Sequence, residues 1–268
     1  MPQASNSIKT ISSLKDFVIA VEARAEVSKP LWFRGVGNSS YKLIPSLYRK
    51  KGVSSAQDFL KLECAIIDWF AHRSRIFLMP SYPSNQRELY FILQHHGVPT
   101  RLLDWTENPF IALFFALSSA LKNETDCALW MLNPEKWNLN FFDGMGLSDN
   151  PIPSYNHDIL KGFLDETSSR AGIFQPHPLA FYGSHNNQRI TAQRGVFVFF
   201  GTGLEPMEDV ARTKKDSDEI LSKIIVKAEH VSKLFDALNS FGYTASVVYP
   251  DLEGMAQEIC YKFDFQRK

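Results

Sequence analysis

Residues 94–116 read QHHGVPTRLLDWTENPFIALFFA, and this stretch decides how the chain folds. Its TRLLDWT part, residues 100–106, is typical of a short strand. Asn108 and Pro109 follow and start a helix, because the missing N–H of a proline is harmless in the first helical turn. The continuation FIALFFALSSALK, residues 110–122, is apolar almost all round. We therefore expect this helix to be buried.

Strand-like and helix-like segments alternate on both sides of this stretch. β-prone runs predict further strands over 31–37, 127–132, 195–201, 222–227 and 245–249. Apolar residues at helical spacing predict helices over 14–26, 57–77, 87–96, 231–241 and 252–263. Ser12 or Ser13 is the expected N-cap of the first helix. The order is no strict βαβ repeat, so the pattern favours an α+β fold with a mixed, largely antiparallel sheet and flanking helices.

The remaining segments are polar. Residues 1–12 look like a loose lead-in, 138–187 like long loops with few elements, and 205–218 like an exposed loop. We expect a helical lead-in over 1–29 and a single domain over 30–268. Within the long loops, Phe181, Tyr182 and His185 cluster before the next strand, either as part of an acceptor-recognition loop or as aromatics pinned to the core.

Composition excludes several classes of protein. Of 268 residues, 44% are hydrophobic and 22% charged, which is the balance of a globular chain. The 29 basic and 29 acidic residues cancel, so no global field draws the protein to nucleic acid or to an anionic membrane. The most apolar stretch is too short to span a bilayer, and the first residues have no signal-peptide core. We expect a cytoplasmic protein that does not bind membranes.

Familiar cofactor and catalytic motifs are missing from the sequence. It contains no GxGxxG, P-loop, HExxH or GxSxG pattern, which disfavours a Rossmann site, a P-loop, a zincin and a hydrolase triad. The three cysteines, Cys64, Cys127 and Cys260, form no CxxC pair, so a disulfide framework or thiolate zinc site is not expected. His95 and His96 are adjacent and point apart on a helix, so no metal is expected there.

Four polar segments stand out as candidates for a site. Arg34 lies between Phe33 and Gly35 in an apolar strand, where it faces either an anionic ligand or a structural carboxylate. Residues 94–106 gather imidazoles, a guanidinium and a carboxylate, as a ligand site or around an Arg101–Asp104 pair. Residues 188–195 form either a site or a plain surface turn before a buried strand, and 249–254 a helix N-terminus with acidic residues.

These segments, in this order, resemble the FRG-domain family, which is named for its Phe-Arg-Gly motif. The matching stretches are WFRG (32–35), LIPSLYR (43–49), QHHGVPTRLLDWTENPFIALFFA (94–116), RITAQRGVF (189–197) and YPDLEGMA (249–256). Together they cover roughly residues 30–260. The long central stretch is highly specific, and the chain is identified as a member of the FRG-domain family.

The chain more distantly resembles ADP-ribosyltransferases of the Arg-Ser-Glu type. These enzymes carry an arginine on the first core strand, a Ser-Thr-Ser strand before a helix, and a catalytic glutamate on a late loop and strand. Arg34 matches the first element, residues 104–106 with the following helix the second, and Gln193 the position of the third. In two places this chain departs from the pattern. Asp104 and Trp105 replace serines, and Gln193 replaces the glutamate.

The second resemblance implies an enzyme that takes NAD as substrate, without a metal, and moves ADP-ribose to protein or RNA. The resemblance to the FRG-domain family implies a role as a toxin or antiphage effector, and an ADP-ribosylating toxin would need an antitoxin or other neutralising partner. A noncatalytic nucleotide- or partner-binding module and a simple NAD hydrolase are the alternatives. Since glutamine carries no charge, a carboxylate from Asp104, Glu219 or Glu253 would have to stabilise an oxocarbenium-like transition state. The implied catalytic residues are Arg34, Gln193 and Asp104, and the implied NAD-binding residues are Arg34, His96, Arg101, Trp105 and Thr106, with Tyr182 as a second candidate for stacking.

Overall fold

The computed structural model of the protein describes residues 9–79, 82–83, 85–164, 175–184 and 187–265. In these residues one seven-stranded sheet has the order β1-β7-β4-β2-β3-β6-β5. Its first strand pairs in parallel with β7, and every other neighbouring pair is antiparallel. The strands are β1 (Lys9–Ile11), β2 (Trp32–Val36), β3 (Leu102–Thr106), β4 (Cys127–Leu132), β5 (Leu179–Phe181), β6 (Gly195–Phe199) and β7 (Leu221–Val226).

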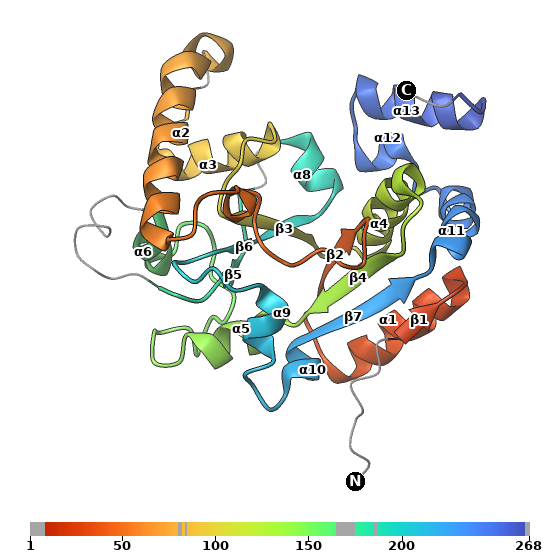
Figure 1. The fold of residues 1–268 in the computed structure, drawn as a ribbon, viewed down its shortest axis with the longest axis horizontal. Coiled ribbons are helices and arrows are strands. Elements are labelled where there is room, and N and C mark those ends of the chain that lie inside the picture. The colour runs from red at the N-terminus through yellow and green to blue at the C-terminus, as the bar shows by residue number, and fades with distance from the viewer. Residues whose placement is uncertain (1–8, 80–81, 84, 165–174, 185–186, 266–268) are drawn as a thin grey trace.

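Helices surround the sheet and account for most of the remaining described chain (Figure 1). The longer ones are α1 (Leu14–Val27), α2 (Ala56–Leu78), α3 (Gln86–His95), α4 (Pro109–Asn123), α5 (Pro134–Phe141), α11 (Ala228–Ser240) and α13 (Leu252–Lys262). The shorter ones are η1 (Leu47–Arg49), η2 (Asp158–Leu160), α6 (Lys161–Leu164), α8 (Gln188–Ala192), α9 (Met207–Ala211), α10 (Ser217–Ile220) and α12 (Ala245–Val248).

Helix α4 is the centre of one apolar layer. Its buried side chains pack with α1, α11 and the inward-facing residues of β4 and β7. Figure 1 shows α1, α4 and α11 gathered beside the β2, β4 and β7 part of the sheet. The opposite face of the sheet packs against a second cluster that includes Trp32, Trp105 and Trp130. A third cluster joins α2 and α3 to β5 and β6. The all-round apolar sequence of α4 thus reflects burial between sheet and helices.

The α+β class and the mixed, largely antiparallel sheet are confirmed. The elements around the central stretch lie where the sequence predicts them, with Ser13 as the N-cap of α1 and Asn108 as that of α4. The lead-in contributes to the same sheet, because β1 pairs with β7. Part of it, residues 1–8, lies outside the described residues. Of the loops expected over 138–187, residues 165–174 and 185–186 also lie outside them.

Two local predictions are wrong. The β-prone run at 245–249 forms the one-turn helix α12, since Ala245 and Val248, three residues apart, are both buried. The polar stretch 205–218 is not a plain exposed loop, because α9 lies within it and buries Met207 and Glu208. In both places tertiary packing overrides the local composition. The short strand β5 also falls in a stretch that we expected to be mostly loop.

The N-cap of α4 gives a prediction about stability. The Asn108 side chain accepts hydrogen bonds from the backbone N–H groups of Phe110 at 2.9 Å and Ile111 at 3.4 Å. Replacing Asn108 by alanine removes this cap, so the free energy of unfolding should fall by about 1 kcal/mol. Urea denaturation checks the value. Asn108→Asp, which keeps an acceptor, should unfold at nearly the wild-type midpoint. Equal urea midpoints for Asn108→Ala and the wild type would contradict the assignment of the cap.

Candidate functional site

A pocket lies where β2 and β3 separate. β2 has five register pairs with β4 but a single one with β3, between Phe33 and Thr106. Beyond that pair a pocket of about 330 Å³ takes its lining from both strands, a size at the lower end of ordinary ligand sites. Other lining residues come from α3, α4 and the turn between α8 and β6. The opening of the sheet therefore creates the site.

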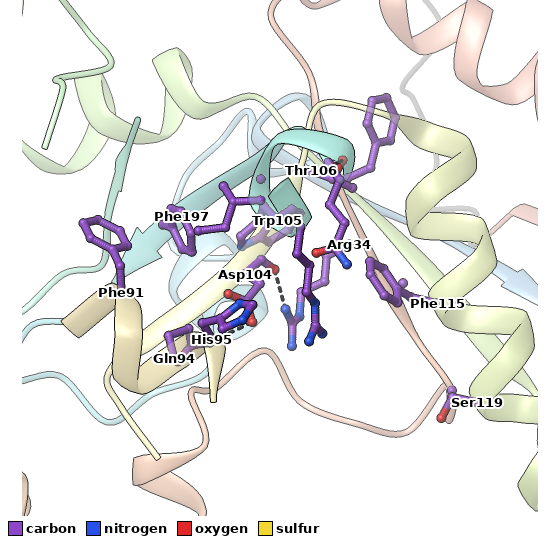
Figure 2. Close-up of a pocket in the computed structure, with 17 residues that line it drawn as sticks. Arg34, Phe91, Gln94, His95, Asp104, Trp105, Thr106, Phe115, Ser119 and Phe197 are labelled. Carbon is purple, nitrogen blue, oxygen red and sulfur yellow. Dashed lines mark hydrogen bonds between the residues drawn. The ribbon is translucent and has the colours of Figure 1, made fainter. Parts of the chain in front are cut away.

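Arg34 bridges the separated strands. Its Nη1 donates a hydrogen bond to the backbone carbonyl of Asp104, drawn as a dashed line in Figure 2. Its Nε is buried and meets no acceptor among the residues that the structure describes. Burial lowers the pKa of Arg34, and the nearby Asp104 opposes that shift. A buried guanidinium with an unused N–H is suited to an anionic ligand.

Gly35 explains why glycine follows the arginine. A Cβ atom at this position would lie 1.9 Å from the backbone oxygen of Ala112 on α4. Only glycine therefore lets α4 pack this closely on β2. The close approach brings Phe115 and Ser119 of α4 to the pocket wall. Phe115 lies on the Arg34 side of the pocket (Figure 2).

Asp104 supplies the carboxylate of the pocket. Its Oδ2 accepts a hydrogen bond from Nε2 of Gln94 at 2.7 Å, and the amide oxygen of Gln94 in turn accepts one from Thr100. The carboxylate is open to the pocket but has protein on its other sides. Desolvation raises its pKa, against the opposing effects of Arg34, Gln94 and Arg189. Among the described residues that line the pocket, no other side chain is acidic.

Helix α8 and the turn between α8 and β6 form the other side of the pocket. The helix contributes Arg189 and the turn contributes Gln193. The Thr106 hydroxyl donates a hydrogen bond to the backbone oxygen of Gln193 at 2.6 Å. The same hydroxyl accepts a hydrogen bond from the backbone N–H of Asn108 at 2.9 Å. Thr106 thus ties the turn to the start of α4. Both hydrogen bonds of its hydroxyl are to backbone groups of the protein.

The structure brings Arg34, Asp104, Thr106 and Gln193 together, as expected, but places two other predicted residues elsewhere. His95, not His96, lines the pocket. The exposed His96 ring packs edge-on against the ring of His95. Burial, then His96 and Arg189, lower the pKa of His95. The rings of His95 and His96 are in contact, so the expectation that the adjacent histidines point apart is wrong. His95 is the one that lines the pocket (Figure 2).

Arg101 does not line the pocket, and the expectation that it does is wrong. Its Nε donates to Glu63 at 2.6 Å, and both side chains are buried. The guanidinium also donates to the carbonyls of Phe163 and Phe200. Its role in the fold is therefore structural. The alternative of an Arg101–Asp104 pair is wrong too, because Glu63 on α2 is the partner of Arg101.

The two residues predicted to stack on nicotinamide are poorly placed to do so. Trp105 reaches the pocket, but only 3% of its surface is exposed and its indole packs in the core cluster on the opposite face of the sheet. Tyr182 is 37% exposed and lies against Trp32 instead.

Glu219 pairs with Lys136, and neither Glu219 nor Glu253 is among the described lining residues. His185 lies outside the described residues.

Gln94, His95 and Arg189 are polar lining residues that were not predicted as members of the site. All three lie inside the polar segments 94–106 and 188–195, so the segments were the right signal. Which members face inward depends on the helical phase of α3 and α8. Aromatic walls from Phe91 and Phe197 complete that side of the pocket (Figure 2).

The pocket combines two guanidinium groups with a single carboxylate among its described lining. Arg34 and Arg189 both act electrostatically on Asp104. Such a site can hold a phosphate or pyrophosphate group with the arginines and present one anionic oxygen to the rest of the ligand. In the described residues no group of three or more potential metal ligands occurs. No helix of the described chain has the length and apolar character needed to cross a membrane.

Fold and site together define an α+β protein with an arginine–carboxylate pocket at an opening of its sheet. Residues 29–125 match the family model of the FRG domain. This range contains β2, β3, α3 and α4, and with them Arg34, Gln94 and Asp104, while Arg189 and Gln193 lie beyond it. The match supports the resemblance to the FRG-domain family over these residues. No curated protein and no solved structure matches it.

Proposed function

We propose that the pocket binds NAD and transfers its ADP-ribose to a macromolecular acceptor, either protein or RNA. The observation that carries the proposal is the position of the Asp104 carboxylate beside Arg34 and Arg189 in one pocket. Guanidinium groups bind the oxygens of a pyrophosphate as forked donors. A carboxylate stabilises the positive charge that develops on a ribose ring as its glycosidic bond breaks.

The bond changes assign a role to each side chain. The bond between C1 of the ribose and the nicotinamide nitrogen breaks, and its electron pair leaves with nicotinamide. A nucleophile of the acceptor forms the new bond to C1 and loses its proton to solvent. Arg34 and Arg189 hold the pyrophosphate, Asp104 faces the charged ribose, and Gln193 accepts a hydrogen bond from a ribose hydroxyl. The half-buried ring of Phe115 offers apolar surface to the nicotinamide or adenine ring.

The acceptor and the biological role follow the sequence resemblance. We propose a toxin or antiphage effector that works in the cytoplasm with a neutralising partner. A net charge of zero gives no long-range attraction to RNA, so an RNA acceptor would have to be met transiently. Transfer to water instead of a macromolecule would make the protein an NAD hydrolase with the same site.

A noncatalytic nucleotide-binding module is the second candidate function. The neutral Gln193 favours it, because the related enzymes carry a glutamate there. Asp104 favours catalysis, since a carboxylate reaches the same pocket from β3. Binding of NAD without release of nicotinamide would decide for the module.

Arg34 provides the test of NAD binding. Arg34→Ala should weaken NAD binding by roughly 10- to 150-fold, which corresponds to the loss of about 1.5–3 kcal/mol for hydrogen bonds to a charged group. Arg34→Lys should recover only part of the affinity, because an ammonium lacks the forked geometry. Isothermal titration calorimetry with NAD measures both. Arg212→Ala is the control, an exposed arginine paired with Asp209 outside the pocket. Equal affinity of Arg34→Ala and wild type would reject the assignment.

A further inference from the structure

The end of α12 holds the amide of Gln193. The Nε2 group of Gln193 donates to the backbone oxygen of Val248 at 3.0 Å. Val248 is the last residue of α12, and carbonyls at a helix C-terminus have no partner within the helix. Because a carbonyl only accepts, the amide nitrogen must face it and the amide oxygen must point elsewhere. Gln193 lines the pocket, so its oxygen is the part left for a ligand.

The next residue, Tyr249, contacts a pocket side chain of helix α8. The Arg189 guanidinium lies over the ring of Tyr249, 4.8 Å from its centroid. Tyr249 in turn packs against Phe114 and Phe115 of α4, with ring centroids 6.3 and 6.0 Å away. A cation held over a ring that is itself packed against a helix has a restricted range of positions. The neighbouring residues Val248 and Tyr249 thus each contact a polar residue of the pocket.

We propose that Val248 and Tyr249 are positioning residues of the pocket and that position 193 requires an amide, not a carboxylate. The Val248 carbonyl orients Gln193, and the Tyr249 ring aims Arg189 at the anionic part of the ligand. A carboxylate at position 193 has no hydrogen to give to Val248 and would face it with an oxygen. Gln193 therefore has a role that a glutamate could not fill, because its amide nitrogen donates to the Val248 carbonyl. The negative charge of the site comes from Asp104. The inference rests on the proposed function only for those experiments below that use NAD as the probe.

The first experiment changes Gln193 to Glu and to Ala. Gln193→Glu should lower Tm by about 2 to 4 °C in the absence of ligand, since a hydrogen bond is lost and a buried carbonyl is left unpaired. Gln188→Glu is the matched control, with the same change of charge on an exposed residue of α8 outside the pocket. It should leave Tm unchanged. A Tm for Gln193→Glu at or above the wild-type value would overturn the inference.

The second experiment changes Tyr249 to Leu and to Phe, with NAD and inorganic pyrophosphate as separate probes. Tyr249→Leu should raise Kd for both probes by roughly three- to tenfold, as expected for loss of a cation–ring contact. Tyr249→Phe keeps the ring and should recover most of the affinity, a difference that a general loss of stability would not produce. If nicotinamide release is measurable, KM should rise more than kcat falls. Unchanged Kd values in a folded Tyr249→Leu variant would refute the role of Tyr249.

The outcomes separate this inference from the proposed function. Higher turnover in Gln193→Glu than in wild type would mean that a carboxylate belongs at position 193, against the inference but in favour of the transferase. Binding of pyrophosphate with the predicted Tyr249 effects, but no cleavage of NAD, would uphold the inference and reject the transferase. If the wild type binds neither probe, the proposed function fails, and the Tm comparison of Gln193→Glu with Gln188→Glu still decides the inference.

Discussion

Asp104→Asn is expected to bind NAD at least as tightly as wild type and to release nicotinamide about 10²- to 10³-fold more slowly. The amide keeps the shape of the side chain and can still accept the hydrogen bond from Gln94. It removes the charge that would stabilise the ribose in the transition state. It also leaves Arg34 and Arg189 without their nearby anion, which favours a negatively charged ligand. Single-turnover measurements with labelled NAD separate the binding step from cleavage.

Asp149→Asn is the control for this change, because Asp149 is exposed and lies outside the pocket. It should cleave NAD like wild type. The pH profile gives an independent check. Since desolvation raises the pKa of Asp104 above 3.8, and its charged form is the active one, kcat should fall as pH drops through that raised pKa. Unchanged turnover in Asp104→Asn would remove Asp104 from the mechanism.

Glu63→Gln is expected to lower the free energy of unfolding by about 3–5 kcal/mol. Glu63 and Arg101 are 3% and 4% exposed, and their side chains meet at 2.6 Å. Removing one charge leaves the other buried without compensation, which costs much more than the intact pair contributes. Because Arg101 precedes β3 and donates to the carbonyl after β6, the loss should affect the whole sheet. Urea denaturation measures the change.

The double variant Glu63→Leu with Arg101→Met tests whether charge causes this loss. Replacing a buried ion pair with apolar side chains of similar volume is often neutral or stabilising. The double variant should therefore unfold at a higher urea concentration than Glu63→Gln. It should still bind NAD, because Arg101 lies outside the pocket. Lower stability than the single variant would show that the hydrogen bonds to Phe163 and Phe200 matter more than the charge.

The architecture was largely predictable from periodicity. The strand at 102–106 and the helix from Pro109 follow from a β-prone run, a capping asparagine and a proline, which are all local signals. The α12 turn was not predictable in this way, because its helical form depends on burying Ala245 and Val248 against distant elements. A strand signal of five residues is too short to resist such packing.

The site was predictable as a set of segments but not as a set of side chains. Arg34 and Asp104 are near because β2 and β3 separate after one pair, and strand separation leaves no mark on either sequence. Arg101 looked like a ligand-binding residue because it shares a segment with Asp104. Its partner Glu63 is distant in sequence, so only the fold reveals the pair. The tie from Gln193 to Val248 likewise spans 55 residues.

Release of nicotinamide from NAD by the wild-type protein is the most direct test of the proposal that the pocket transfers ADP-ribose from NAD. The assay supplies labelled NAD and cell lysate as the source of acceptors, with Asp104→Asn and Asp149→Asn measured in parallel. We expect the wild type to release nicotinamide and to place label on protein or RNA. Asp104→Asn should lose both activities, and Asp149→Asn should keep both. If the wild type binds NAD but releases no nicotinamide, the pocket is a noncatalytic binding site. If it does neither, the proposal that this pocket acts on NAD is contradicted.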